Sequence, residues 1–209
     1  MYRRNLKHSR VKNIFKFVSS KMNQVLTVES RLEFDTCFHF EYSTEIEHFI
    51  AQPEGFYYSY QDKQYPYTPD FLIIDKGVKK FVEVKPWQKA QSVEFHQRFS
   101  AKQKQVNQHN IPLILVTDKQ IRVNPVLNNL KLLHRYSGFQ SLTPLHQSLL
   151  DIVRRSNQIQ IKNLAKYLSI EYGIAIKMTL GLLSSGLLYT NLTAQELNLE
   201  SFVWCDSDE

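Results

Sequence analysis

The stretch Tyr65–Pro86, with the sequence YPYTPDFLIIDKGVKKFVEVKP, decides the fold expected for this chain. Residues 71–74 are a short apolar run that predicts a strand, and residues 80–84 predict a second strand. Between them, Asp75-Lys76-Gly77 is typical of a tight turn, because glycine accepts a positive φ without steric cost. The sequence therefore predicts a β-hairpin, around which the rest of the chain is organised.

Charged side chains lie at one end of this predicted hairpin. Asp70 follows Pro69 at the start of the first strand, where the missing N–H of a proline is tolerated. Along the second strand, alternate side chains point to opposite faces, so Glu83 and Lys85 share a face. The hairpin is therefore expected to gather Asp70, Glu83 and Lys85 at one edge of a sheet.

Two carboxylates held close together repel each other, and one takes up a proton unless a cation lies between them. Mg²⁺ suits this position because it binds through a few carboxylates and keeps several waters. Lys85 would then hold or polarise an attacking water and offset the charge of a scissile phosphate. The alternative interpretation is an ordinary surface hairpin that carries an exposed pair of Glu83 and Lys85.

Pro69-Asp70 followed by Glu83-Val84-Lys85 matches the PD-(D/E)xK nuclease signature. The wider sequence resembles the TnsA family, which is the endonuclease subunit of a heteromeric cut-and-paste transposase. The resemblance also rests on pieces in a fixed order: residues 29–33, Gln52-Pro53, residues 67–71, residues 82–86, and Ile111-Pro112 leading to residues 116–118. Together these pieces cover about residues 10 to 136.

The resemblance implies hydrolysis of DNA phosphodiesters that depends on Mg²⁺, for which Mn²⁺ substitutes. Two ions about 3.5–4 Å apart would stabilise both the attacking and the leaving oxygen, and Lys85 would orient the nucleophilic water. The implied metal ligands are Glu33, Asp70, Glu83 and the main-chain carbonyl of Val84, and the implied catalytic residues are Glu33, Asp70, Glu83 and Lys85.

Glu33 is expected to come from an early helix. Residues 28–42 predict this helix, with Thr27 as its N-cap. In the family an active-site acid arrives from such a helix, which implies that Glu33 binds or positions a second ion. Glu29 is the alternative because it lies one turn earlier on the same side. We interpret Glu29 as an acid favoured by the helix dipole.

The resemblance also implies partners. The protein would cleave double-stranded DNA at the 5′ ends of a mobile element, a DDE-type transposase would cut the 3′ ends, and an AAA+ ATPase would regulate both. A stand-alone nuclease, such as a restriction enzyme or a junction resolvase, is the alternative among enzymes. The alternative from another class is an inactive nuclease-like module that binds DNA or a partner, against which the intact Asp70, Glu83 and Lys85 argue.

The composition of the 209 residues predicts a cytoplasmic protein with a substantial core, and the family resemblance implies a bacterial one. Hydrophobic residues make up 43% of the chain, and no apolar run approaches the length that spans a membrane. Cys37 and Cys205 lie far apart and lack the spacing of a zinc site, which predicts two reduced thiols.

Positive charge is concentrated at the N-terminus. Seven Lys or Arg residues and no Asp or Glu precede Glu29, while the whole chain carries +6. The arm 1–28 is therefore predicted to bind phosphate backbones, and a solvated tail is the alternative. The predicted DNA contacts are Arg3, Arg4, Arg10 and Lys12 in this arm, with Lys102 and Lys104 on a later helix, where a solvated face is the alternative.

The elements that follow complete a nuclease domain over residues 29–138. We expect two strands within residues 45–67, an amphipathic helix at 88–110, a buried strand at 111–117 and a helix at 124–136. The predicted fold class is α/β, with a restriction-endonuclease-like mixed sheet flanked by helices.

A second domain is expected over residues 139–209. Its pattern predicts three helices, at 144–155, 162–169 and 174–185, and short strands at 187–189 and 202–204. This order indicates a small winged-helix domain. The third helix carries only Lys177 as a basic residue, so DNA binding and protein docking both stay open.

Overall fold

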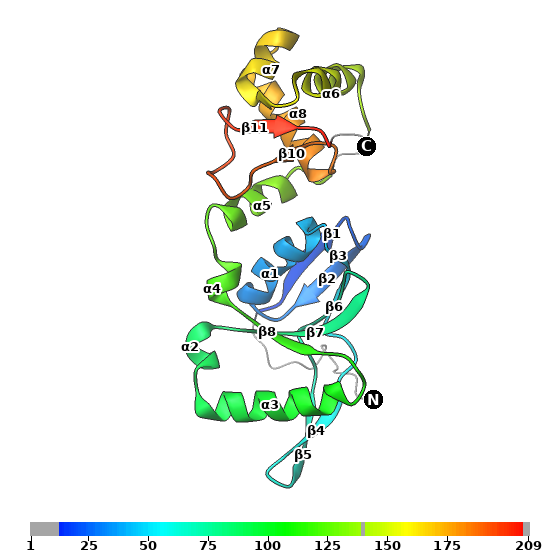
Figure 1. Cartoon of the computed structure of the whole chain (residues 1–209), viewed down its shortest axis with the longest axis vertical. Coiled ribbons are helices and arrows are strands. Elements are labelled where there is room, and N and C mark those ends of the chain that lie inside the picture. The colour runs from blue at the N-terminus through cyan, green and yellow to red at the C-terminus, as the bar shows by residue number, and fades with distance from the viewer. Residues whose placement is uncertain (1–12, 139–140, 207–209) are drawn as a thin grey trace. The chain divides into compact units, whose positions relative to one another are not determined.

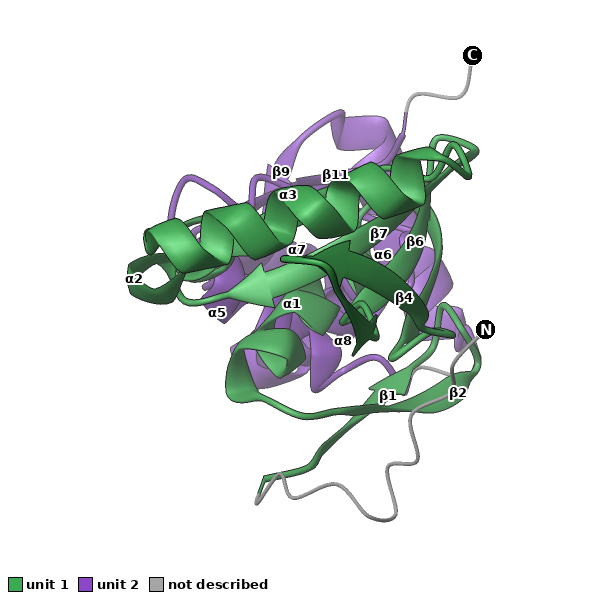
Figure 2. Cartoon of the chain, turned by 90° about the horizontal axis from the view of Figure 1, so that it is seen from below, with its two compact units in different colours: residues 1–122 green, residues 123–209 purple. Residues whose placement is uncertain are grey.

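The computed structural model describes residues 13–138 and 141–206. The chain forms two compact units, the first ending at residue 122 and the second starting at residue 123 (Figure 2). The predicted DNA contacts Arg3, Arg4, Arg10 and Lys12 lie outside the described residues. Within the described ranges, every helix falls short of the length and apolarity that a membrane span requires.

A four-stranded mixed sheet lies at the centre of the first unit (Figure 1). Across the sheet its strands are β3 (Ile46–Ala51), β6 (Phe71–Asp75), β7 (Val78–Lys85) and β8 (Leu113–Thr117). The pairs β3–β6 and β6–β7 are antiparallel, whereas β7 and β8 run parallel. The predicted α/β class, with a mixed sheet flanked by helices, is therefore confirmed.

The predicted hairpin is formed by β6 and β7. Asp75 pairs with Val78, which leaves Lys76 and Gly77 as a two-residue loop with φ values of 49° and 75°. Two successive positive φ values give the turn whose twist matches that of the flanking strands. Phe71 pairs with Val82, so Asp70, one residue earlier, lies level with Glu83.

The parallel strands β7 and β8 are joined by a helical crossover. The single helix predicted at 88–110 is in fact two helices, α2 (Trp87–Ala90) and α3 (Val93–Asn107). The break falls where Ser92 caps α3, because its hydroxyl accepts the N–H of Phe95 at 3.2 Å. Such a cap requires extended backbone at Ser92, which interrupts the helix.

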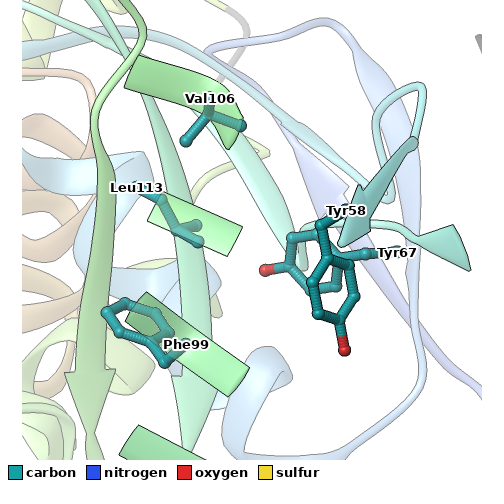
Figure 3. Packing of buried hydrophobic residues seen from close by; sticks show 5 residues of the cluster. All are labelled: Tyr58, Tyr67, Phe99, Val106 and Leu113. Carbon is teal, nitrogen blue, oxygen red and sulfur yellow. The ribbon is translucent and has the colours of Figure 1, made fainter. Parts of the chain in front are cut away.

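Helix α3 packs through its apolar side against the sheet and a separate hairpin. The hairpin consists of β4 (Phe56–Tyr60) and β5 (Lys63–Tyr67), so the region 45–67 holds three strands instead of the predicted two. A buried cluster joins the three parts (Figure 3), and its members are Tyr58 and Tyr67 from the hairpin, Phe99 and Val106 from α3, and Leu113 from β8.

A further hairpin corrects the prediction that residues 1–28 form one basic arm. It is made of β1 (Phe15–Ser19) and β2 (Gln24–Val28). Phe17 is buried, and its ring meets those of Phe34 and Phe38 with centroids 5.8 and 5.1 Å apart. The arm therefore ends in a strand pair that belongs to the core of the first unit.

Helix α1 (Arg31–Tyr42) starts later than predicted, because the residues up to Val28 belong to β2. Its N-cap is Ser30 and not Thr27, and the Ser30 hydroxyl accepts the N–H of Glu33 at 3.1 Å. The position of Glu33 is thus fixed by the first turn of the helix.

The other end of α1 is held by Lys21, which lies in the turn between β1 and β2. Its ammonium group donates hydrogen bonds to three main-chain carbonyls, those of Phe40 at 2.8 Å, Ser43 at 2.6 Å and Ile46 at 2.9 Å. A cation that pairs with the last carbonyls of a helix satisfies acceptors that the helix leaves open and also suits its dipole. Both ends of the helix that carries Glu33 are therefore fixed.

The first unit ends with α4 (Asp118–Ile121), and the second begins with α5 (Val126–His134). The predicted boundary at residue 138 is therefore too late. The reason is Asn129, which is buried in the second unit. Its amide donates to the carbonyls of Leu192 and Gln195, and its Oδ1 accepts the N–H of Leu197.

The second unit contains the three helices and two strands that the sequence predicted. The helices are α6 (Pro144–Ser156), α7 (Ile161–Leu168) and α8 (Tyr172–Ser184). Strands β10 (Tyr189–Thr190) and β11 (Phe202–Trp204) pair together, and a short strand β9 (Ile159–Gln160) extends them to three. The winged-helix assignment stays a prediction.

Candidate active site

The start of β6 and the end of β7 bring Asp70 and Glu83 side by side. Oδ2 of Asp70 accepts the main-chain N–H of Val84 at 2.7 Å. The carbonyl of Asp70 accepts the N–H of Gln52 at 2.9 Å, which ties this residue to the end of β3. The structure thus places Asp70, Glu83 and Val84 together, as the sequence predicted from the hairpin register.

Glu83 is buried, with an exposed fraction of 3%, and is surrounded by donors. Lys85, on the same face of β7, lies with its Nζ 3.2 Å from Oε1. Lys102 approaches from α3, with its Nζ 3.4 Å from Oε2. The hydroxyl of Tyr67, from β5, donates a short hydrogen bond to Oε2. Three donors from three elements therefore fix the carboxylate of Glu83.

The electrostatics of the site follow from this crowding of charge. Burial raises the pKa of Asp70 well above its usual range, and the charges of Glu83 and Glu33 raise it further. Burial acts to lower the pKa of Lys85, but the charges of Glu83 and Asp70 outweigh it and the pKa is raised. This crowding therefore shifts Asp70 towards its protonated form.

Glu33 is buried at the N-terminus of α1, and its carboxylate is held from two directions. Oε2 accepts the main-chain N–H of Glu29 at 3.0 Å and the side-chain amide of Gln52 at 3.3 Å. Burial raises the pKa of Glu33. The competitor Glu29 is thus a main-chain partner of Glu33, and its role as a helix-start acid stays a prediction.

The carboxylates of Asp70 and Glu83 suit a small, hard cation that prefers oxygen ligands. Among residues 13–138 and 141–206, no three His, Cys, Asp or Glu side chains form a group that could hold one ion. An ion bound by Asp70 and Glu83 would therefore keep several waters, which is typical of Mg²⁺. Two oxygens close to Asp70 along the main chain or through a hydrogen bond, Oε1 of Gln52 and Oγ1 of Thr68, are buried without a hydrogen-bond partner in the described part of the chain.

Of the two DNA contacts predicted on α3, Lys102 lies in the candidate site and Lys104 lies on the surface. Lys102 was predicted as a phosphate contact on the helix face, but only 12% of its side chain is exposed, and it lies at Glu83 and 3.8 Å from the ring centroid of Tyr67. Lys104 is exposed and its predicted DNA contact stays a prediction.

Tyr67 and Gln52 are contacts of the site that the sequence analysis did not assign. Both lie in pieces of sequence that carried the family resemblance, which was the only signal available for them. Their contacts depend on how β5 and the end of β3 pack against distant elements. The hairpin pattern of β6 and β7 says nothing about that packing.

The mixed sheet flanked by helices fits a nuclease-like fold, and one end of its hairpin brings Asp70, Glu83 and Lys85 together. Residues 43–118 match the family model described as TnsA-like endonuclease N terminal. The predicted resemblance to the TnsA family is therefore confirmed for this segment, which indicates a nuclease related to transposition. No curated protein matches the chain.

The bond from Tyr67 to Glu83 leads to a testable prediction about stability. Tyr67→Phe removes one donor from a buried carboxylate and should lower the free energy of unfolding by about 1–3 kcal/mol. Chemical denaturation measures this change. Tyr57→Phe is the matched control, because half of the Tyr57 side chain is exposed and its loss should have little effect. Equal stability of the two variants would contradict the assigned bond.

Proposed function

We propose that the protein is the Mg²⁺-dependent DNA endonuclease subunit of a heteromeric transposase, which cleaves the 5′ ends of a mobile element. The observation that carries this proposal is the pairing of Asp70 with Glu83 beside Lys85, in a segment that matches the TnsA-like family model. Double-stranded DNA at the element ends is the proposed substrate, with a DDE-type transposase and an AAA+ ATPase as partners.

Asp70 and Glu83 are the residues proposed to hold the ion, with the carbonyl of Val84 as a third ligand and Glu33 binding or positioning a second ion. Bound magnesium would supply Lewis-acid stabilisation of charge on the phosphate and a more acidic water. Mn²⁺, with similar oxygen chemistry, should substitute.

Lys85 is the residue proposed to orient the attacking water. Its Nζ lies 3.2 Å from Glu83, and 38% of its side chain is exposed, so the ammonium group is reachable by substrate. The charges of Glu83 and Asp70 raise the pKa of Lys85, so it stays protonated and can donate to a water or to a phosphate oxygen. Lys102 is more enclosed and acts on Glu83.

A nicking assay on DNA that carries an element end tests this function. The expected result is cleavage at the 5′ end that requires Mg²⁺ and the neighbouring transposase, and that EDTA stops. Efficient cleavage by the purified protein alone would instead favour the stand-alone nuclease. Absence of cleavage with Mg²⁺, Mn²⁺ and the transposase all present would favour the inactive binding module.

A further inference from the structure

Gln52 contacts Asp70 through its main chain and Glu33 through its side chain. Its main-chain N–H donates to the carbonyl of Asp70 at 2.9 Å. Its side-chain amide donates to Oε2 of Glu33 at 3.3 Å. Gln52 therefore connects the acid that arrives from α1 with the acid at the start of β6.

The backbone of Gln52 has a conformation that its residue type disfavours. Its φ is 49°, in the left-handed region that glycine and asparagine adopt most readily. The next residue is Pro53, and residues before proline favour extended backbone. A glycine at this position would remove the strain. Strain of this kind persists where the surrounding structure requires it, and it is found most often at functional sites.

Gln52 has a side-chain amide oxygen that accepts no hydrogen bond from the described residues. Its Nε2 is used by Glu33, while Oε1 is buried and has no hydrogen-bond partner among the described residues. A buried acceptor without a partner costs free energy unless a ligand or water meets it. The carbonyl oxygen of an amide is a suitable acceptor for an ion-bound water.

From these three observations we infer that Gln52 is a positioning residue of the proposed active site. It holds Glu33 in register with Asp70 and presents Oε1 to water of the metal site. This inference rests on the proposed function, because it assigns Gln52 to the same ion-binding centre. Groups that orient metal ligands in this way typically change metal affinity by about 10- to 100-fold when they are removed.

The chain offers a closely matched control. Gln61 is also a glutamine with a φ of 49°, but it is exposed and lies in the turn between β4 and β5. Gln52→Gly and Gln61→Gly therefore make the same chemical change at the same backbone conformation. Only the first of them removes contacts with Glu33.

Calorimetric titration with Mn²⁺, without DNA, gives a readout that does not need cleavage. Gln52→Gly should bind Mn²⁺ about 10- to 100-fold more weakly than the wild type, whereas Gln61→Gly should bind as the wild type does. Both should melt near the wild-type temperature, because glycine suits a positive φ. Gln52→Leu, which keeps a bulky side chain but has no amide, should show the same loss of affinity.

The possible outcomes separate this inference from the proposed function. Equal Mn²⁺ affinity of the wild type and Gln52→Gly would overturn the role of Gln52 and leave the nuclease proposal intact. Weak binding by Gln52→Gly but normal binding by Gln52→Leu would assign the effect to the backbone, which also overturns it. A lower melting temperature with unchanged affinity would make Gln52 structural only. If the wild type itself binds no Mn²⁺, the inference and the proposed function fall together.

Discussion

Asp70→Asn should abolish strand cleavage, with a loss of at least about a thousandfold, equal to about 4 kcal/mol of transition-state stabilisation. Asn keeps the shape of the side chain and an oxygen that can accept the N–H of Val84, but it lacks the negative charge that would bind the ion. Binding to DNA should survive. The measurement is the nicking assay together with a DNA-binding assay on the same preparation.

Asp75→Asn is the matched control for this substitution. Asp75 lies at the other end of β6, where it pairs with Lys80 at 2.6 Å. Its replacement by Asn should leave cleavage unchanged. Cleavage by Asp70→Asn at the rate of Asp75→Asn would remove Asp70 from the active site and with it the proposed chemistry.

Asp70→Asn should also change how the free energy of unfolding depends on pH. Burial and then the charges of Glu83 and Glu33 raise the pKa of Asp70, so the folded protein keeps a proton that the unfolded chain releases. The free energy of unfolding of the wild type should therefore fall, relative to Asp70→Asn, as pH rises above the usual carboxyl range towards neutrality. Chemical denaturation over that range measures the difference, and added Mg²⁺ should stabilise only the wild type. A pH-independent difference would contradict the raised pKa.

Phe71→Ala should cause the largest loss of stability, about 3–5 kcal/mol. Phe71 is fully buried beside Asp70, and its ring meets that of Phe40 at right angles with centroids 5.2 Å apart. Truncation would leave a cavity between β6 and α1 that the stiff sheet cannot close. The measurement is chemical denaturation followed by tryptophan fluorescence.

The two tryptophans allow the first unit to be observed by itself. Trp87 lies in the first unit and Trp204 in the second, so a Trp204→Phe background leaves Trp87 as the reporter. Tyr57→Ala in that background is the control, because Tyr57 is half exposed. A loss below about 1 kcal/mol for Phe71→Ala would contradict its place in the core.

The sequence was sufficient to predict the central hairpin and the charged edge. The turn at Lys76-Gly77 has a strong local signal, and the period of two along β7 places Glu83 and Lys85 on one face whatever the rest of the chain does. These features depend on residues close together in the chain. Local patterns are therefore enough to predict them.

Other parts of the site depend on packing between distant segments. In the sequence, Lys102 looks like an ordinary surface lysine of a polar helix. Only the packing of α3 brings its ammonium group to Glu83, 19 residues away in sequence. The strands β1 and β2 were not predicted, because the many lysines and arginines of residues 1–28 indicated a basic arm. Helix α5 has a buried apolar side, but this side does not reveal which unit it packs against.

The hydrogen-bond donors around Glu83 have a consequence for how the protein folds when no metal is bound. The ammonium groups of two lysines and the hydroxyl of a tyrosine already stabilise this carboxylate. We therefore expect the chain to fold without a bound metal ion. If the proposed Mg²⁺ dependence holds, removal of the ion should leave an inactive but folded protein that regains activity when Mg²⁺ is added back.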